Sequence, residues 1–489
     1  MPLLALLILA APQDPVATFT EHVAPIVFAN CVKCHREGEV APFPLTSYHD
    51  VRKRGKMIAR VTARRYMPPW HPVEGHGDFA GAMRLSDDEI ETIARWVDQG
   101  MPEGDPHQLP TLPAFTPGWQ LGEPDLVVKM TEGFPVPAGG ADIYRSFAIP
   151  LQFDGDRWVT AIEVRPSARS VLHHIVFALD TSGSARRAEG EDGKPGFDGM
   201  RRVASGFGGW AVGGMPQHLP QGLAVRLPKG ADLVLNSHFH PSGKAETEQT
   251  TLGLYFAKEP PTRSLVTLQL PPRFGVAAGL DVPAGKRDFE LEDSFTLPVA
   301  AEAVTVGGHA HMICAEMQVF VTPPGEERRS IFWIDDWDFD WQNRYQYRTP
   351  VALPKGTLVE VRIRYDNSAD NPDNPFDPPR RIRWGLQSTD EMGSVSLLLV
   401  AKDEAEAPAL RRAIQAHARA ALRAGGASTV LAGVLTRIRM ADRDGDGIVA
   451  IADLPARLQT VARRADTNGD GNLDDAEIEA ATEAFERRR

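Results

Sequence analysis

The segment Val171-Leu172-His173-His174-Ile175-Val176-Phe177 combines β-branched and aromatic residues, which favour strands, with two adjacent histidines. Similar runs recur between residues 126 and 400, separated by turns rich in Gly, Pro and Asp. Short strands at this spacing predict antiparallel β-sandwiches rather than an α/β fold. The runs are Leu126–Met130, Trp158–Val164, Leu172–Leu179, Leu233–His238, Leu252–Phe256, Met317–Val321, Leu358–Tyr365 and Val395–Val400.

A Pro-Pro break at Glu259–Thr262 divides this β region into two predicted sandwich domains, residues 126–260 and 261–404. The flanking regions are predicted to be helical. In residues 14–105, Ser86 and Glu89 have the spacing of a capping box, and Gly100 can end the helix that follows. Residues 106–125 are Pro-rich and predict a linker, whereas residues 405–489 are Ala- and Arg-rich. The expected fold class is therefore multidomain, with α domains on both sides of two antiparallel β-sandwiches.

The chain has a net charge of -12, which argues against nucleic acid and anionic membrane surfaces as partners because both require a basic patch. Residues 1–12 contain one apolar run ending in small residues, which predicts a secretory signal peptide. This run is too short to span a bilayer, and no other run is long enough. We therefore expect a periplasmic or extracellular protein without a transmembrane segment.

The motif Cys31-Val32-Lys33-Cys34-His35 contains two of the three cysteines in the chain. In Cys-x-x-Cys-His the thiols add to the vinyl groups of haem, and the histidine becomes an iron ligand. The alternatives, a zinc half-site or a redox Cys-x-x-Cys, are disfavoured because no second Cys pair exists and His follows directly. We expect covalent haem c in residues 14–105, a segment that resembles the cytochrome c fold over about 90 residues.

The second axial ligand of this haem is predicted to be Met67, in Tyr66-Met67-Pro68-Pro69-Trp70. The prolines stiffen the loop, and a thioether ligand would raise the reduction potential. Ligation by His71 or His76, or the absence of a sixth ligand, remain alternatives.

Six of the 14 histidines fall in three strand-like motifs, His173-His174, His238-Phe239-His240 and His309-Ala310-His311. Residues two apart on a strand face the same way, so His309 and His311 can bind one metal without distortion. His173 and His174 would face opposite sides of a regular strand, so joint ligation requires a bulge or strong twist. Isolated core or surface histidines are the alternative, but three such motifs in one β region favour metal binding.

All-imidazole sites accept zinc or copper, and a soft thioether selects copper, especially Cu(I). Met392, in Asp390-Glu391-Met392, fits that role. A zinc hydrolase is disfavoured because no carboxylate accompanies the histidines as it does in His-Glu-x-x-His enzymes.

In this order, the motifs resemble those of the type II copper, ascorbate-dependent monooxygenases, which include peptidylglycine hydroxylating monooxygenase and dopamine β-hydroxylase. The resemblance covers about residues 126–400 and implies two jelly-roll sandwiches, each with one copper, facing a solvent-filled cleft. It implies an electron-transferring copper on His173, His174 and His238, with His238 preferred over His240. It also implies an oxygen-activating copper on His309, His311 and Met392.

The chain departs from peptidylglycine enzymes at the residues that anchor the substrate carboxylate. The resemblance implies an Arg at position 307 and a Tyr at position 396, where this chain has Gly307 and Ser396. Without the bidentate partner, peptide amidation is not expected. Two neighbouring signals have structural interpretations. Cys314 is expected to be a buried small side chain, with metal ligation as the alternative. Asp335–Trp341 is expected to be a surface strand with a loop, with a cleft lining or an ion site as the alternatives.

Two loops near the C-terminus match the EF-hand pattern, with glycine at the sixth position and an acidic residue at the twelfth. Val449 and Leu473 occupy equal positions and are expected to pair between the loops. We expect Ca²⁺ there in a structural role. The predicted ligands are Asp442, Asp444, Asp446 and Asp453 in the first loop, and Asp466, Asn468, Asp470 and Glu477 in the second.

Together these features favour an exported haem-containing copper monooxygenase that hydroxylates a C–H bond of an unknown small organic substrate with O₂. An external donor would reduce the fused haem, which would supply the electrons to the copper. The rival from another class is a non-catalytic electron-transfer or copper-binding protein on the same fold.

Overall fold

The computed structural model describes residues 16–37, 39, 41–115, 118–198, 206–211, 214–439, 441, 447–474, 476–478, 480–481 and 484. The chain forms two compact units. The first consists of Met1–Trp70 and Gly81–Phe115, and the second of His71–Ala80 and Thr116–Arg489. The predicted signal peptide lies outside the described residues.

The first unit is built on three α-helices, α1 (Ala24–Asn30), α2 (Tyr48–Ala63) and α3 (Asp87–Asp98). A π-turn, η1 (Phe19–Val23), precedes α1, and a short 3-10 turn, η2 (Pro106–Gln108), follows α3. The capping box at Ser86 and Glu89 is confirmed, because each side chain bonds the backbone of the other residue. The helices enclose an apolar core that includes Phe19, Val27, Ile93 and Trp96.

The first sandwich of the second unit pairs two antiparallel sheets, ordered β1-β11-β4-β8 and β6-β3-β9-β5-β7. Their inner faces share one core to which both sheets contribute, because buried apolar residues alternate along the strands. The short strands β2 and β10 pair beside them, and α4 (Ser184–Ala188) lies between β5 and β6. The strands are β1 (Leu126–Lys129), β2 (Phe134–Val136), β3 (Ile143–Pro150), β4 (Arg157–Arg165), β5 (Leu172–Asp180), β6 (Phe197–Asp198), β7 (Gly206–Ala211), β8 (Val225–Leu227), β9 (Asp232–Phe239), β10 (Glu246–Glu248) and β11 (Thr251–Phe256).

The second sandwich pairs sheets ordered β12-β21-β15-β18 and β14-β19-β16-β17, with the small ladder β13-β20 beside them. Strict alternation of burial along β19 shows why its sequence forms a strand with one face in the core. The 3-10 turn η3 (Pro272–Gly275) follows β12. The strands are β12 (Leu265–Leu270), β13 (Asp281–Val282), β14 (Phe289–Thr296), β15 (Ala301–Ala310), β16 (Cys314–Thr322), β17 (Arg329–Ile334), β18 (Arg344–Leu353), β19 (Leu358–Tyr365), β20 (Ile382–Arg383) and β21 (Gly393–Ala401).

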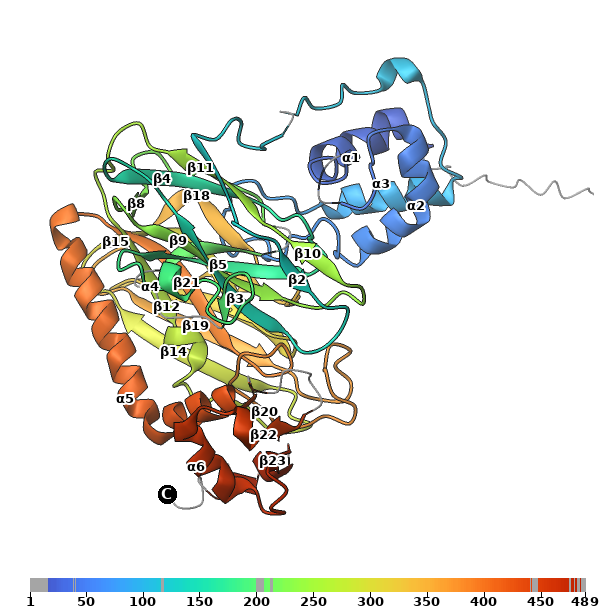
Figure 1. Cartoon of the computed structure of the whole chain (residues 1–489). Helices are drawn as coiled ribbons and strands as arrows, with labels where there is room; N and C mark the ends of the chain where they lie inside the picture. The colour runs from blue at the N-terminus through green and yellow to red at the C-terminus, as the bar shows by residue number, and fades with distance from the viewer. Residues whose placement is uncertain are drawn as a thin grey trace, which may run out of the picture. The chain divides into compact units, whose positions relative to one another are not determined.

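The C-terminal part begins with the 3-10 turn η4 (Glu404–Glu406) and the long helix α5 (Ala407–Arg439), which contacts β12 and β21 and runs beside the second sandwich in Figure 1. It continues with β22 (Val449–Ala450), η5 (Ile451–Asp453), α6 (Ala456–Ala465) and β23 (Asn472–Leu473). The predicted pairing of Val449 with Leu473 is confirmed. No helix in the described part of the chain is both long and apolar enough to cross a membrane.

The expected fold class, with an α cytochrome c domain, two β-sandwich copper domains and an α EF-hand pair, is wrong. Strands make up 32% of the chain and helices 22%, so the protein is mostly β, without a clear helical cytochrome domain at its N-terminus. The N-terminal prediction failed for two physical reasons. Between its helices the backbone of the first unit is irregular, and His71–Ala80 leaves it for the β unit.

This excursion, His71–Ala80, pairs with two strands of the second sandwich. Its Val73 N–H donates to Trp333 O at 2.8 Å, and its Ala80 N–H donates to Gln346 O at 2.8 Å. The Phe79 ring, 4% exposed, packs on Tyr347 with a centroid separation of 5.0 Å. The excursion is therefore a structural part of the β unit, although the chain on both sides of it belongs to the helical unit.

Phe79→Ala is expected to destabilise the β unit by about 3–5 kcal/mol, because it removes a buried ring from an aromatic cluster. Urea unfolding measures the loss, and hydrogen exchange in β17 and β18 locates it. Val127→Ala is the matched control, because Val127 is 46% exposed in the same unit. Equal stability of the two variants would contradict the assignment of this segment to the β unit.

Candidate metal centre

A β-bulge at the start of β5 gives His173 and His174 their unusual arrangement. In the ladder between β5 and β9, Leu172 pairs with Phe239 and His174 with His238, so His173 is the extra residue. The bulge turns two adjacent side chains toward one point, which a regular strand forbids. The bulge that the sequence analysis required for joint ligation by His173 and His174 is therefore present.

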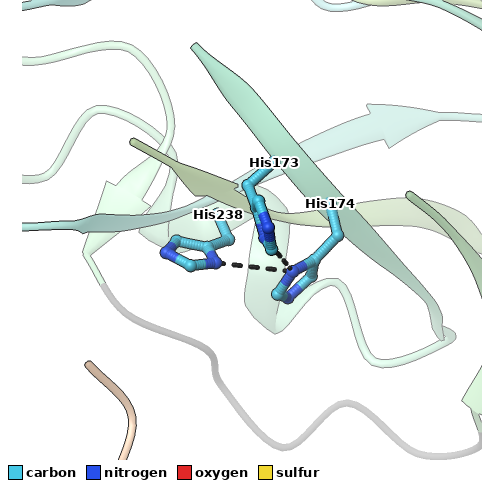
Figure 2. A group of neighbouring side chains, drawn as sticks. All are labelled: His173, His174 and His238. Carbon is cyan, nitrogen blue, oxygen red and sulfur yellow. Dashed lines mark hydrogen bonds between the residues drawn. The ribbon is translucent and has the colours of Figure 1, made fainter. Parts of the chain in front are cut away.

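Three imidazoles converge beside this bulge, and Figure 2 shows them facing one another. Nδ1 of His174 lies 3.1 Å from Nδ1 of His173 and 3.4 Å from Nδ1 of His238. One ligand atom from each residue falls within 4.8 Å of the others, a spacing suited to one metal ion. We call His173, His174 and His238 the first group.

The second group comprises His309, His311 and Met392. Nδ1 of His309 donates to Oε1 of Gln342 at 2.6 Å, and Nδ1 of His311 donates to the Asp390 carbonyl at 3.2 Å. These bonds leave both Nε2 atoms as the available metal donors. Ala310 pairs with Gly393 between β15 and β21, which makes His311 and Met392 neighbours at the ends of adjacent strands. Met392 is 6% exposed.

The two groups lie next to each other. The rings of His174 and His309 are 5.7 Å apart between centroids, and those of His309 and His311 are 5.5 Å apart. Phe339 stacks on His173 at 4.2 Å and lies 6.0 Å from His311. At these residues the groups therefore meet directly, not across the solvent-filled cleft that the resemblance implied.

Burial favours the neutral form of four of these imidazoles, those of His173, His174, His309 and His311, and the neutral form is the one that binds metal ions. Burial, reinforced by the neighbouring rings, lowers the pKa of His173 to about 3 and that of His309 to about 4. The pKa values of His174 and His311 fall well below the ordinary value for the same reasons. These four histidines therefore offer unprotonated nitrogen donors at neutral pH.

The Glu391 side chain binds backbone N–H groups around the second group. Its side chain is fully buried and accepts N–H bonds from His311, from Ile313 at 3.2 Å and from Met392 at 2.7 Å. A buried carboxylate with several donors fixes the backbone that it bridges. The Asp-Glu-Met tripeptide thus holds His311 through the Asp390 carbonyl and the Glu391 carboxyl group.

His240 stands outside the first group. Its side chain is 63% exposed, and its Nδ1 bonds Asp142 at 2.7 Å. The same carboxylate lies 3.2 Å from Nε2 of His238, at ion-pair distance although without an aligned hydrogen bond. Burial raises the pKa of Asp142, but the contacts with His238, His240 and Ser388 outweigh it and hold that pKa well below its usual range.

Several residues near the groups were missed from the sequence. Phe339 lies in Asp335–Trp341, which forms a surface loop as predicted, although without the predicted strand, and its ring stacks on His173. Gln342 follows it and orients His309. Arg344 pairs with Gly307 across β15 and β18, while Ser396 pairs with Gly307 on the other side. An arginine therefore stands beside the position where the resemblance had implied one.

The haem motif forms a tight turn after α1. The His35 N–H donates to Cys31 O at 2.9 Å, and Nδ1 of His35 donates to Phe43 O at 3.1 Å, leaving Nε2 available. Cys31 and Cys34 form no disulfide, and burial raises the pKa of Cys31 to about 12. Met67 lines a small hollow with Leu85 and Ile90 in the same unit.

The other two iron-ligand candidates belong to the second unit. There the ring of His76 packs on Trp333 at 4.7 Å.

Cys314 is buried, its pKa is raised by burial, and its thiol contacts the Glu316 carbonyl at 3.9 Å. This placement fits a packed small side chain, and the group of three histidines does not include it.

The second predicted calcium loop is folded around its own carboxylates. Asp466 accepts the Gly469 N–H at 2.7 Å, and Glu477 accepts the Thr467 N–H at 2.8 Å and the Asn468 N–H at 3.1 Å. Asp470 accepts the Asn472 N–H at 2.8 Å. In the first loop Asp453 ends η5, whereas Asp442, Asp444 and Asp446 lie outside the described residues.

Asp338→Asn is expected to stabilise the folded protein at pH 7.5 by about 1–2 kcal/mol, allowing for partial exposure. Burial, with Asp340 and Asp373 nearby, raises the pKa of Asp338 to about 6. Because folding raises the pKa of this acid, the free energy of unfolding falls as pH rises from about 4 to about 6. Chemical denaturation at pH 4.5 and 7.5 tests this, with exposed Asp335→Asn as the control. An equal gain at both pH values would contradict the shift.

No protein-family model matches the chain, and no curated protein matches it. Among solved structures it is similar to the major capsid protein P2 from bacteriophage PM2, at 8% identity over 56% of this chain and 97% of that chain, with a TM-score of 0.24. It is also similar to N-glycanase F, at 12% identity over 57% and 96%, with a TM-score of 0.24. A third is PBCV-1 VP54, at 8% identity over 56% and 93%, with a TM-score of 0.25. These scores are too low to bear on fold or function.

Proposed function

We propose that the chain is an exported copper-dependent monooxygenase that uses O₂ to hydroxylate a C–H bond of a small organic substrate. The observation that carries this proposal is the meeting of the two histidine groups, with His174 and His309 at 5.7 Å. Two adjacent metal-binding groups with different donors suit a reaction that needs both electron delivery and O₂ activation.

The donor sets fit copper at both groups. The first group offers three imidazoles, with Nδ1 atoms turned toward one another. The second offers the Nε2 atoms of His309 and His311, with the thioether of Met392 at the neighbouring strand position. Neutral imidazoles with a thioether select copper over zinc. Copper bound there would supply one-electron transfer and O₂ activation.

The overall reaction consumes R–H, O₂, two electrons and two protons, and yields R–OH and water. The protein's own residues hold the donors in place for it. Gln342 and the Asp390 carbonyl fix the tautomers of His309 and His311, and Phe339 shields His173 from water. Such pre-organisation is how a protein lowers the cost of redox chemistry.

We further propose that haem c binds at Cys31 and Cys34, with His35 and Met67 as axial ligands, and delivers the electrons. Two thiols that form no disulfide, together with the oriented ring of His35, fit this group. Calcium at the C-terminal loops is proposed as a structural ion, held in the second loop by Asp466, Asn468, Asp470 and Glu477.

His173→Ala and Met392→Ala are each expected to lose one copper or to bind it at least about 100-fold more weakly, because each removes a ligand. Metal analysis and copper EPR, on protein matured with haem outside the cytoplasm, measure this against two coppers per haem in the wild type.

His218→Ala is the matched control. His218 is exposed, bonds Thr160 and lies outside both groups, so its loss should leave copper binding unchanged. Copper binding indifferent to His173 and Met392 would refute the monooxygenase proposal. Binding at both groups without O₂ consumption for any substrate would instead favour the non-catalytic copper carrier.

Chemically reduced haem is expected to re-oxidise about tenfold faster in air when copper is bound, because a tethered donor has a high effective concentration. Stopped-flow absorbance of the haem band measures the rate with and without copper. His173→Ala should remove the acceleration, whereas His218→Ala should keep it. An unchanged rate in copper-loaded wild type would contradict electron delivery from haem to the copper centre.

A further inference from the structure

Residues 385–392, here called the Met392 loop, form a closed turn that ends at the second group. The Gly385 N–H donates to Glu391 O at 3.1 Å, and the Asp390 N–H donates to Gln387 O at 2.9 Å. Ser388 is 6% exposed, Asp390 is 7% exposed and Glu391 is fully buried. These internal hydrogen bonds stiffen the loop, so a contact at its tip, Ser388, bears on its base, Asp390–Met392.

The tip of this loop is held by Asp142, which stands just before β3 in the first sandwich. Asp142 accepts the Ser388 N–H at 3.0 Å and the Ser388 hydroxyl. The same carboxylate bonds His240 and lies 3.2 Å from His238, and its side chain is only 6% exposed. One buried carboxylate therefore contacts a first-group ligand and the loop that carries a second-group ligand.

Tyr144, two residues after Asp142 and within β3, also connects His238 to the Met392 loop. Its ring stacks on His238 at 4.4 Å with an interplanar angle of 13°, and its hydroxyl donates to the Leu386 carbonyl. Tyr144 also pairs with His238 in the ladder between β3 and β9. Tyr144 in β3 and Asp142 just before it thus both tie His238 to the tip of the Met392 loop.

The base of the loop reaches the second group directly. The Asp390 carbonyl accepts from His311, and the Glu391 carboxylate bonds the backbone of His311 and Met392. A path therefore runs from His238 to Asp142 and Ser388 by polar contacts, along the backbone of the Met392 loop to Asp390, and from its carbonyl to His311. The path consists of buried groups, where such contacts are strongest.

We propose that Asp142 is a positioning residue shared by both groups, which couples the geometry of the first to that of the second. This inference rests on the proposed function only for the identity of the metal. A change that releases Ser388 alters the second group, although neither Asp142 nor Ser388 belongs to it.

The first test needs no metal. Asp142→Asn keeps the shape of the side chain but removes an acceptor, so hydrogen exchange at Ser388 and along residues 386–392 should speed up about tenfold in the metal-free protein. Asp156→Asn is the matched control. Like Asp142, Asp156 accepts a backbone N–H and a side-chain donor, here the Lys229 N–H and the Arg226 guanidinium. Unchanged exchange in Asp142→Asn would overturn the proposed path.

The second test measures Cu(I) affinity at one group at a time. In Met392→Ala protein, which leaves the first group intact, Asp142→Asn should weaken binding about 10–100-fold, as loss of an outer partner does. In His173→Ala protein, which leaves the second group, both Asp142→Asn and Ser388→Ala should weaken binding severalfold and reduce the sulfur contribution to the copper X-ray absorption spectrum. Ser388→Thr, which keeps the hydroxyl, should restore both.

The outcomes separate the two proposals. If Asp142→Asn affects the first group alone, Asp142 is a partner of His238 only and the coupling is refuted. If wild type binds no copper but the exchange result holds, the path stands and the copper function falls. If copper binds normally and neither test responds, the path is refuted and the copper function stands.

Discussion

The bulge that places His173 outside the ladder between β5 and β9 is the constraint on which the site depends. A regular strand would send one of two adjacent histidines into the core of the first sandwich and leave the other alone. With the bulge, both reach His238, whose own position is fixed by pairing with Tyr144 on the other side. The first group is thus a consequence of strand register, and a one-residue slip would dismantle it.

The sequence could predict the features that local spacing dictates. The bulge followed from two adjacent histidines in a β-branched run, and the cap at Ser86 and Glu89 followed from their separation. The pairing of Val449 with Leu473 followed from equal loop positions. The fold class could not be predicted in this way. Helical patterns on either side of residues 71–80 concealed that this segment pairs with β17 and β18, because backbone hydrogen bonds between distant segments leave no periodicity.

The surroundings of the site were equally hidden. Phe339 and Asp142 carry no motif, and each acts through a contact with a residue far away in the sequence. Gln342 and the Asp390 carbonyl act on single ring nitrogens, which only three-dimensional geometry reveals. A ligand motif identifies which atoms can bind a metal, whereas tautomer and orientation are set by partners that any loop can supply.

The use of opposite ring nitrogens gives the two groups different mechanical properties. Nδ1 lies next to the Cβ atom, so a metal held by the first group is tied closely to the backbone of β5 and β9. Nε2 lies at the far end of the ring, and in the second group its position depends on what holds Nδ1. Gln342 and the Met392 loop are therefore as important to the second group as the bulge is to the first. For the proposed reaction, a rigid group beside an adjustable one would suit electron transfer with little rearrangement at the first and a change of ligands at the second.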